Sequence, residues 1–331
     1  MSGGKARRTL IGHAVTPFLF APPMDSSKYI KTDLAHGRTP HRHQASVSHC
    51  IGDWELVGRL GEGEWSIVYR GRPRDCPPDW PADYAIKVAT ADDDKRQRAE
   101  QLLLREATVG RAVAHPHLVA VLSTHLDRSP PAIVMPLMQG VTLDRAVAAH
   151  APFSTPHSLW IARQIAEALA ELHQNGWLHA DVKPGNIHLS AAGHATLIDL
   201  GFALKLNSSE SAAGGTLRGS PTYTAPEMIS SSVAVDSYCD VYSLGVTLYE
   251  LLTGSPPFAE TEPGPLMLAH MQRAVPNPRL ARPMLQREIW DLLQDMLAKE
   301  PLRRPSAPEL VDRLVDLEVA TLDERVASYS P

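Results

Sequence analysis

Hydrophobic and polar positions change character along this chain of 331 residues. Residues 1 to about 52 show no sustained periodicity and are rich in Ser, Pro and His, which predicts a flexible arm with one docked segment at residues 15–20. From residue 54 onward, short apolar or alternating runs separated by turn residues predict strands. The expected strands lie at residues 54–60, 67–71, 84–89 and 115–122, within 131–143, and at 187–190 and 195–199.

Helical spacing of apolar residues follows in three stretches. They cover residues 91–113, which begin with acidic residues, then 142–150, and then 156–175. The segment 136–140 would connect an N-terminal part built mainly of strands to a C-terminal part built mainly of helices. The pattern therefore predicts an α+β protein with two lobes.

The polar stretch 179–186 reads H-A-D-V-K-P-G-N and directly follows the longest apolar helix. It places Asp181, Lys183 and Asn186 in one loop, and Asp199 follows thirteen positions after Asn186. A carboxylate can accept a proton from a hydroxyl group, a lysine can neutralise a moving phosphoryl group, and amide and carboxylate oxygens can hold magnesium. The spacing favours phosphoryl transfer, and a polar loop that caps a helix is the alternative at this point.

A glycine-rich turn lies upstream, between the first two predicted strands. Gly61 and Gly63 leave room for phosphate oxygens to approach the backbone, although a tight hairpin without a ligand would have the same sequence pattern. A dinucleotide-binding loop is disfavoured because the residues after the turn alternate like a strand and do not open a helix. Lys87 lies in an apolar strand and needs an anionic partner there. Glu106, beside the apolar stripe of the helix at 91–113, is favoured over Glu100 for that role.

Net charge argues against nucleic acid as the main partner. The total is −5, but residues 1–50 contain seven Lys/Arg and two Asp/Glu and so carry +5, which leaves −10 for the rest. This mild overall charge favours neither nucleic acid nor an anionic membrane surface. His41, His43, His49 and Cys50 match no standard zinc spacing, so a metal site in the arm is not expected.

The cysteines and the apolar runs favour a cytoplasmic location. Cys50, Cys76 and Cys239 form no disulfide pattern, which favours a reducing compartment, and Cys239 is expected to be buried. A run of eighteen apolar residues is absent, so no membrane span is expected. The basic start and the apolar run at residues 10–23 resemble a signal peptide only faintly, because histidine and proline interrupt the run.

Taken together, these motifs resemble a eukaryotic-type protein kinase, and specifically a bacterial Ser/Thr kinase of that superfamily. The resemblance spans about residues 54–317, and the motifs occur in the family's order. They are G-E-G-E-W-S-I-V, Y-A-I-K, L-L-L-R-E-A, H-A-D-V-K-P-G-N, D-L-G, G-S-P-T-Y-T-A-P-E, D-V-Y-S-L-G-V-T-L-Y-E-L-L-T-G-S-P-P-F and P-L-R-R-P-S. The fold it implies is a small, mainly antiparallel β lobe with one regulatory helix and a larger helical lobe.

The resemblance also implies a role for each matching residue. Asp181 would be the catalytic base and Lys183 would contact the transferred phosphoryl group, while Asn186 and Asp199 would hold Mg²⁺, with Mn²⁺ as an alternative. Lys87, fixed by Glu106, would grip the phosphates of ATP. The residues expected around ATP are Leu60, Gly61, Gly63, Val68, Ala85, Lys87, Glu106, Met135, Met138 and His188. Structural ties are expected from Glu227 to Arg304 and from Asp240 to the catalytic loop.

Several positions depart from the family's pattern. Ala180 replaces the arginine that usually receives a phosphate on the activation segment, so activity should depend only weakly on phosphorylation there. Leu200 and Ser66 replace a phenylalanine and a glycine, both mild changes. His188 replaces an aliphatic residue under adenine, where a flat ring can stack. Gly110 is expected to leave a small gap on the regulatory helix and to make that helix mobile.

Lys183 and Ser220 match the Ser/Thr-specific branch, so protein Ser/Thr is the expected substrate, with a cognate phosphatase as a further partner. Autophosphorylation is expected within the Ser-rich activation segment, at residues such as Ser208, Ser209, Ser211 and Thr216, although these could equally be solvated loop residues. The alternatives are a pseudokinase that serves as a scaffold and a small-molecule kinase, which would lack both A-P-E and the lysine at 183. The expected domains are the arm at 1–52, a kinase domain at 53–318 with lobes at about 53–136 and 140–318, and a tail at 319–331.

Overall fold

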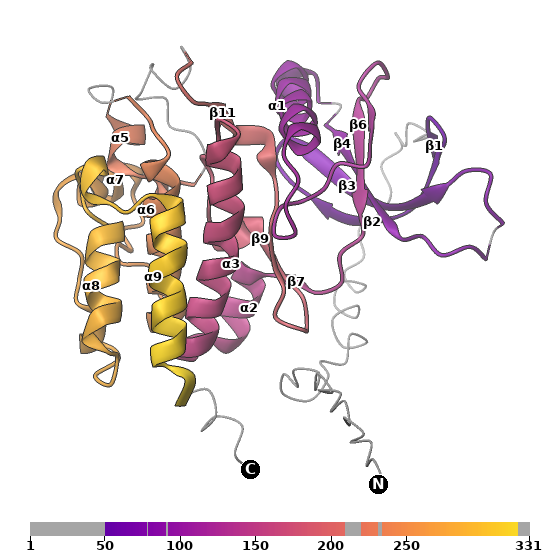
Figure 1. Ribbon diagram of the computed structural model, residues 1–331. Coiled ribbons are helices and arrows are strands. Elements are labelled where there is room, and N and C mark those ends of the chain that lie inside the picture. The colour runs from indigo at the N-terminus through magenta and orange to yellow at the C-terminus, as the bar shows by residue number, and fades with distance from the viewer. Residues whose placement is uncertain (1–49, 78, 91, 209–219, 231–233, 324–331) are drawn as a thin grey trace, which may run out of the picture.

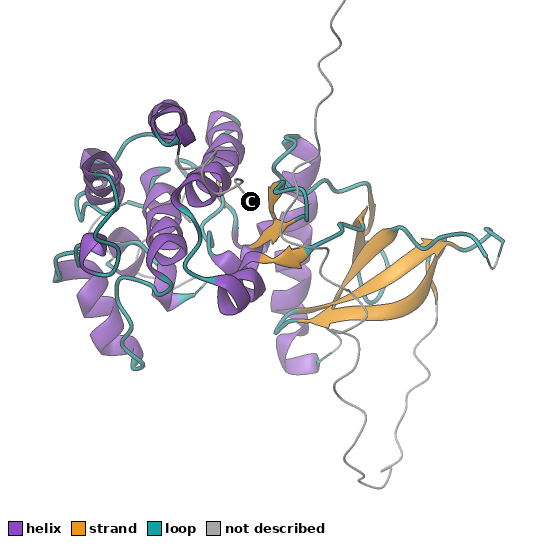
Figure 2. Ribbon diagram, turned by 90° about the horizontal axis from the view of Figure 1, so that it is seen from below, coloured by secondary structure: helices purple, strands orange, loops and turns teal. Residues whose placement is uncertain are grey.

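The computed structural model describes residues 50–323 except 78, 91, 209–219 and 231–233. One lobe is a curled sheet with a single long helix beside it, and the other lobe is mainly helical (Figure 1). Seen from below, the two lobes lie side by side and are joined through short connections (Figure 2). The predicted α+β fold with two lobes is confirmed.

The sheet of the smaller lobe has six strands in the order β1-β2-β3-β4-β6-β5, and each neighbouring pair is antiparallel. Its strands are β1 (Cys50–Ile51), β2 (Trp54–Glu62), β3 (Ser66–Pro73), β4 (Tyr84–Ala89), β5 (Ser123–His125) and β6 (Ala132–Pro136). The long helix α1 (Asp93–Ala112) follows β4. Sheet pairing therefore begins at Cys50, before the domain start that the sequence predicts at residue 53.

Strand register divides this sheet into two faces. Ile86 and Val88 of β4 pack with Val134 of β6 on one face. Because neighbouring residues of a strand point to opposite faces, Ala85 and Lys87 point to the other face, toward the helical lobe. The alternation of β4 thus places a lysine and an alanine at the junction of the lobes.

The prediction of a strand at residues 115–122 is wrong, because β5 begins only at Ser123. This segment instead crosses to the helical lobe, where Leu118 forms an isolated parallel bridge with Leu197. Nδ1 of His117 also lies 2.8 Å from the carbonyl oxygen of Ala195. The apolar run reflects burial of Leu118 and Val119 between the lobes and not pairing within the sheet.

The helical lobe is built around α3 (Thr155–Gln174) and α6 (Tyr238–Thr253). Its other helices are α2 (Leu143–His150), α5 (Pro226–Ile229), α7 (Pro263–Gln272), α8 (Arg287–Met296) and α9 (Ala307–Ala320). Short strands lie on the side facing the sheet: β7 (Val141–Thr142), β8 (Trp177–Leu178), β9 (Ile187–Leu189), β10 (Ala195–Leu197) and β11 (Leu204–Lys205). Cys239 is fully buried at the start of α6, as the sequence predicts.

Three sequence predictions lie outside the described residues: the docked segment at 15–20, the histidines of the arm, and the phosphorylation sites Ser209, Ser211 and Thr216. Within the part of the chain that is described, no helix combines the length and the apolar character needed to span a bilayer.

Candidate active site

Asp240 of α6 holds the loop at 179–186 from below. Its carboxylate accepts the backbone N–H groups of His179 and Ala180, each at 2.8 Å, and lies 2.9 Å from Nε2 of His173. Burial alone would raise the pKa of Asp240, but the contact with His173 and the N–H donors hold it below its usual value. A buried carboxylate with this many donors fixes the path of the loop, as the sequence predicts.

Ala180 adopts a left-handed backbone conformation, with φ at 62°. This region costs an L-residue roughly 1 kcal/mol or more. The hydrogen bond from its N–H to Asp240 offsets part of that cost. The turn at Ala180 directs the next side chain, Asp181, toward the space between the lobes.

Asp181 is held by three donors. One carboxylate oxygen accepts Nζ of Lys183 and Nδ2 of Asn186, both at 2.7 Å, and the other accepts the backbone N–H of Ser220 at 3.1 Å. Its side chain is 3% exposed. Because rotation is blocked on both oxygens, the carboxylate presents a fixed acceptor direction, which a group that receives a proton requires.

Lys87 forms the predicted ion pair with Glu106. Its Nζ lies 2.6 Å from Oε2 of Glu106 and 3.0 Å from Oδ1 of Asp199. Burial alone would lower the pKa of Lys87, but the two carboxylates raise it above its usual value, so the amine stays charged. Burial raises the pKa of Glu106, while Lys87 holds that of Asp199 below its usual value. The two lobes therefore meet in one charge cluster, in which Glu106 is buried and Lys87 and Asp199 are partly exposed.

Oxygen atoms suited to a magnesium ion lie beside this cluster. Nδ2 of Asn186 donates to the backbone carbonyl and the carboxylate of Asp181, which leaves its Oδ1 without a hydrogen bond to the described part of the chain. Oδ1 of Asp199 accepts Lys87 and the N–H of Gly201, so its Oδ2 is likewise available. Carboxylate and amide oxygens are ligands that magnesium prefers, and these residues therefore fit the metal that the family implies.

Register places the predicted ATP contacts of the sheet on one face. Val68 lies opposite Lys87, and Ala85 lies opposite Met135, so these four side chains share the face toward the helical lobe. The turn between β2 and β3 closes through the N–H of Gly63 and the carbonyl of Ser66 at 2.8 Å.

The glycine turn also leaves open space beside its backbone. A Cβ at Gly61 would meet no atom within 4 Å, and at Gly63 it would meet only the Ser66 carbonyl at 3.8 Å. Leu60 is 47% exposed at the edge of the same turn. The backbone of this turn is therefore open to approach at both glycines.

The remaining predicted contacts come from the connector and from β9. Met138 is half-buried in the connector, and Gly140 follows with φ at 135° and no room for a side chain, since a Cβ there would lie 2.1 Å from the carbonyl of Leu189. His188 lies on β9 between Thr142 and Thr196 in the register. Burial lowers the pKa of His188, so its ring is neutral at pH 7.

One buried side chain near the site, that of His179, depends on contacts that sequence analysis did not use. His179 is fully buried, its Nε2 lies 3.1 Å from the Ile198 carbonyl, and its Nδ1 accepts the N–H of Asp181 at 3.3 Å. It thus links the loop of Asp181 to the strand that leads into Asp199. The only sequence signal was a polar residue two positions before Asp181, which by itself does not reveal a partner.

The gap expected at Gly110 is not present. A Cβ there would lie 2.4 Å from Cγ2 of Val121 and 3.7 Å from Cδ1 of Leu200. Val121 from the segment before β5 fills the space that a side chain on α1 would otherwise occupy. This compensation was not visible in the sequence because the segment was assigned to a strand.

Comparison with known proteins agrees with this geometry. Residues 54–314 match the protein kinase domain. The chain is 34% identical over 270 residues to the serine/threonine-protein kinase PknK of Mycobacterium bovis, covering 80% of this chain and 24% of that protein. It is 33% identical over 263 residues to PknB of Mycobacterium tuberculosis, covering 78% and 41%. It is 30% identical over 255 residues to PknH of Mycobacterium bovis, covering 77% and 42%. The match thus spans less than half the length of each of these relatives.

Proposed function

This chain belongs to the protein kinase family, and from that premise we propose that it transfers the γ-phosphoryl group of ATP to Ser and Thr hydroxyl groups of proteins, itself included. The observation that carries the proposal is the fixed carboxylate of Asp181 beside Lys183 and Asn186. A pure scaffold has no need of a buried acceptor held in one direction.

Each residue of the cluster has a defined task in this reaction. Asp181 orients the acceptor hydroxyl and receives its proton, while Lys183 stabilises the charge of the phosphoryl group in transfer. Lys87, held by Glu106, grips the phosphates of ATP. Asn186 and Asp199 would hold magnesium, which supplies neutralisation of the phosphate charge when bound. Because these groups are positioned beforehand, little reorganisation is needed during transfer.

The acceptor class follows from Ser220 and Lys183. The backbone N–H of Ser220 binds the carboxylate of Asp181, so the activation segment reaches the catalytic centre directly. Lys183 and Ser220 also match the Ser/Thr-specific branch of the family, and this match supports a Ser/Thr acceptor over Tyr. In a cell we place this kinase in cytoplasmic signalling, with a cognate phosphatase that reverses its products.

The pseudokinase alternative is disfavoured by the same contacts. Asp181, Lys183 and Asn186 are joined by hydrogen bonds, and Lys87 forms ion pairs with Glu106 and Asp199, so every residue expected to act in the transfer is present. The relatives at 30–34% identity are named as serine/threonine-protein kinases.

The proposal is tested by incubating the full chain with γ-labelled ATP, magnesium and three acceptors: a mixed Ser/Thr peptide set, a Tyr peptide set and an aminoglycoside. Label should appear on Ser and Thr of the peptides and of the chain itself, as read by mass spectrometry. Transfer mainly to the aminoglycoside or to Tyr would contradict the acceptor class. ATP binding without any transfer would support the scaffold instead.

A further inference from the structure

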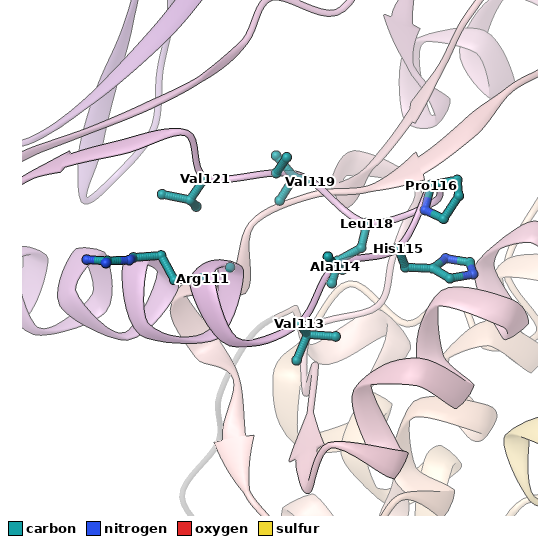
Figure 3. A pocket seen from close by; sticks show the side chains of 10 residues that line it. Arg111, Val113, Ala114, His115, Pro116, Leu118, Val119 and Val121 are labelled. Carbon is teal, nitrogen blue, oxygen red and sulfur yellow. The ribbon is translucent and has the colours of Figure 1, made fainter.

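A cavity of about 570 Å³ lies behind α1, away from the residues assigned above. It is formed where the helix ends and the chain turns toward β5, and Figure 3 shows its lining side chains. Most of the lining is apolar, and Val113, Leu118 and Val119 are buried in its walls. This volume falls within the usual range of small-molecule pockets, which is about 300–1,000 Å³.

The two large polar side chains of the lining are both nitrogen donors. Arg111 lies at one end of the set and His115 at the other (Figure 3). Nδ1 of His115 accepts the N–H of His117 at 3.2 Å, so the proton of the neutral ring is on Nε2. Arg111 makes no ion pair or side-chain hydrogen bond with the described residues. The lining set contains no carboxylate, so none of its residues pairs with the positive charge of Arg111.

Two side chains, Val121 and Leu200, lie between one wall of the cavity and the charge cluster. Val121 lines the cavity and fills the space beside Gly110. The next neighbour of Gly110 is Leu200, which follows Asp199 and whose backbone is hydrogen-bonded to Glu106. The cavity is therefore separated from Glu106 and Asp199 by only one layer of packed residues.

We propose that this cavity binds a small amphipathic carboxylate and that its occupancy is coupled to nucleotide binding. The apolar body of the ligand lies between the end of α1 and Val119 and Val121, and its carboxylate pairs with the guanidinium of Arg111. A filled cavity holds Val121 against Gly110 and so favours the arrangement in which Glu106 reaches Lys87. The coupling rests on the proposed function, whereas the binding site does not.

The positive charge of Arg111 favours a carboxylate ligand over the N-terminal arm of the chain as the occupant of the cavity. Residues 1–50 carry a net charge of +5, the same sign as Arg111, so the arm lacks complementarity to the cavity. A carboxylate with an apolar chain matches both the wall and the cation. The arm as occupant is therefore an outcome of the test and not the proposal.

Binding is measured by calorimetry of the full chain with decanoate, without nucleotide, so the result does not depend on kinase activity. Decanoate should bind, and Arg111→Gln should weaken it by about tenfold or more because a charge-assisted pair is lost. Ala114→Trp, which places an indole in the cavity from its exposed rim, should abolish binding. Arg279→Gln and Ala148→Trp, at exposed positions elsewhere, are the matched controls and should bind as the wild type does.

Three results would overturn the site. The first is no binding of decanoate to the wild type. The second is equal binding of decanoate and decanol that is insensitive to Arg111→Gln, since it would show apolar adsorption without charge recognition. The third is binding of a synthetic peptide of residues 1–49, lost in Ala114→Trp, with no binding of decanoate, since it would make the arm the occupant.

Coupling is measured with a non-hydrolysable ATP analogue and magnesium. Saturating decanoate should tighten analogue binding by about fivefold or more, and the analogue should tighten decanoate binding by the same factor, because linkage is reciprocal. Ala114→Trp should lose the decanoate effect. An analogue affinity that is the same with and without bound decanoate would overturn the regulatory role, and it would leave the test of phosphoryl transfer unaffected.

Discussion

Ala180 determines, at the scale of one residue, how strongly the activation segment can control the catalytic loop. Its φ of 62° turns the chain toward Asp181, and its methyl group offers no cation to a phosphate. The backbone N–H of Ser220 donates a hydrogen bond to the carboxylate of Asp181. The catalytic carboxylate is therefore ordered by contacts within the chain.

Replacing Thr216 with Ala should leave most of the transfer rate intact, because position 180 provides no arginine to receive a phosphate there. Thr216 lies outside the described residues, so the expectation rests on Ala180 alone. Initial rates on a Ser/Thr peptide would be compared for the wild type and Thr216→Ala. A large loss of transfer rate in Thr216→Ala would show that a cationic side chain elsewhere in the chain binds a phosphate on Thr216.

Residue types predicted much of the chemistry, but not its supporting contacts. Lys87 and Glu106 could be paired from an apolar strand and a helical stripe, and they lie 2.6 Å apart. The role of His179 depends on the carbonyl of Ile198, nineteen positions away, which no local pattern reveals. Partners that are far apart in sequence and use backbone atoms leave no signature in side-chain spacing.

At the scale of elements, α1 depends on the segment that follows it. The stretch at 115–122 has the composition of a strand, yet it packs Leu118 against β10 and Val121 against α1. An apolar run indicates that a segment is buried. Whether that segment pairs with a strand or packs against the other lobe depends on the tertiary fold. This is why the gap predicted at Gly110 is filled in the folded chain.

Gly110→Ala should destabilise α1 despite the better helix propensity of alanine. A Cβ there would lie 2.4 Å from Cγ2 of Val121, and such overpacking costs roughly 1–3 kcal/mol against a propensity gain of about 1 kcal/mol. Chemical denaturation and ATP affinity would both be measured. Val121→Ala in the same chain should restore both, and a Gly110→Ala variant that gains stability would refute the close contact.

Arg304 and Glu227 join the segment that bears A-P-E to the base of the helical lobe. Nη1 and Nη2 lie 2.6 and 2.9 Å from the two carboxylate oxygens, and both side chains are almost fully buried. Arg304→Leu should destabilise the protein by about 3–5 kcal/mol because Glu227 would remain as an uncompensated buried charge.

The control for this effect is Arg163, which pairs with Glu318 and Glu167 at a less buried position, where its side chain is 17% exposed. Arg163→Leu should lower the free energy of unfolding clearly less than Arg304→Leu does in the same denaturation experiment. Equal losses for the two variants would show that burial of the charge does not set the cost.

At the scale of the whole molecule, the two lobes meet at charged groups, while the partly buried Lys299 is a cation within the helical lobe. Nζ of Lys299 lies 2.7 Å from the His270 carbonyl and 4.7 Å from the ring centroid of Phe258. Burial, with Arg304 nearby, lowers the pKa of Lys299 to about 8. Within the described residues this amine contacts carbonyl and hydroxyl oxygens but no carboxylate, so its charge opposes folding.

Global stability should therefore rise as pH increases from about 8 toward 10.5. In that window the unfolded lysine still carries its proton while the folded one has lost it, so the unfolded state binds more protons and deprotonation favours folding. The rise attributable to Lys299 should be about 1–2 kcal/mol after allowance for its partial exposure. Denaturation of the wild type and Lys299→Met across this range measures it, and parallel curves for the two proteins would contradict it.

We propose that Asp181 serves the transfer step while Lys87, Glu106 and Asp199 serve nucleotide binding. The most direct test compares γ-phosphoryl transfer with magnesium–ATP affinity in the wild type, Asp181→Asn and Asp199→Asn. Asp181→Asn should bind magnesium–ATP as the wild type does and lose about 10²- to 10⁴-fold in transfer rate. Asp199→Asn should lose the magnesium dependence of binding itself. Transfer that persists at the wild-type rate in Asp181→Asn would contradict the claim.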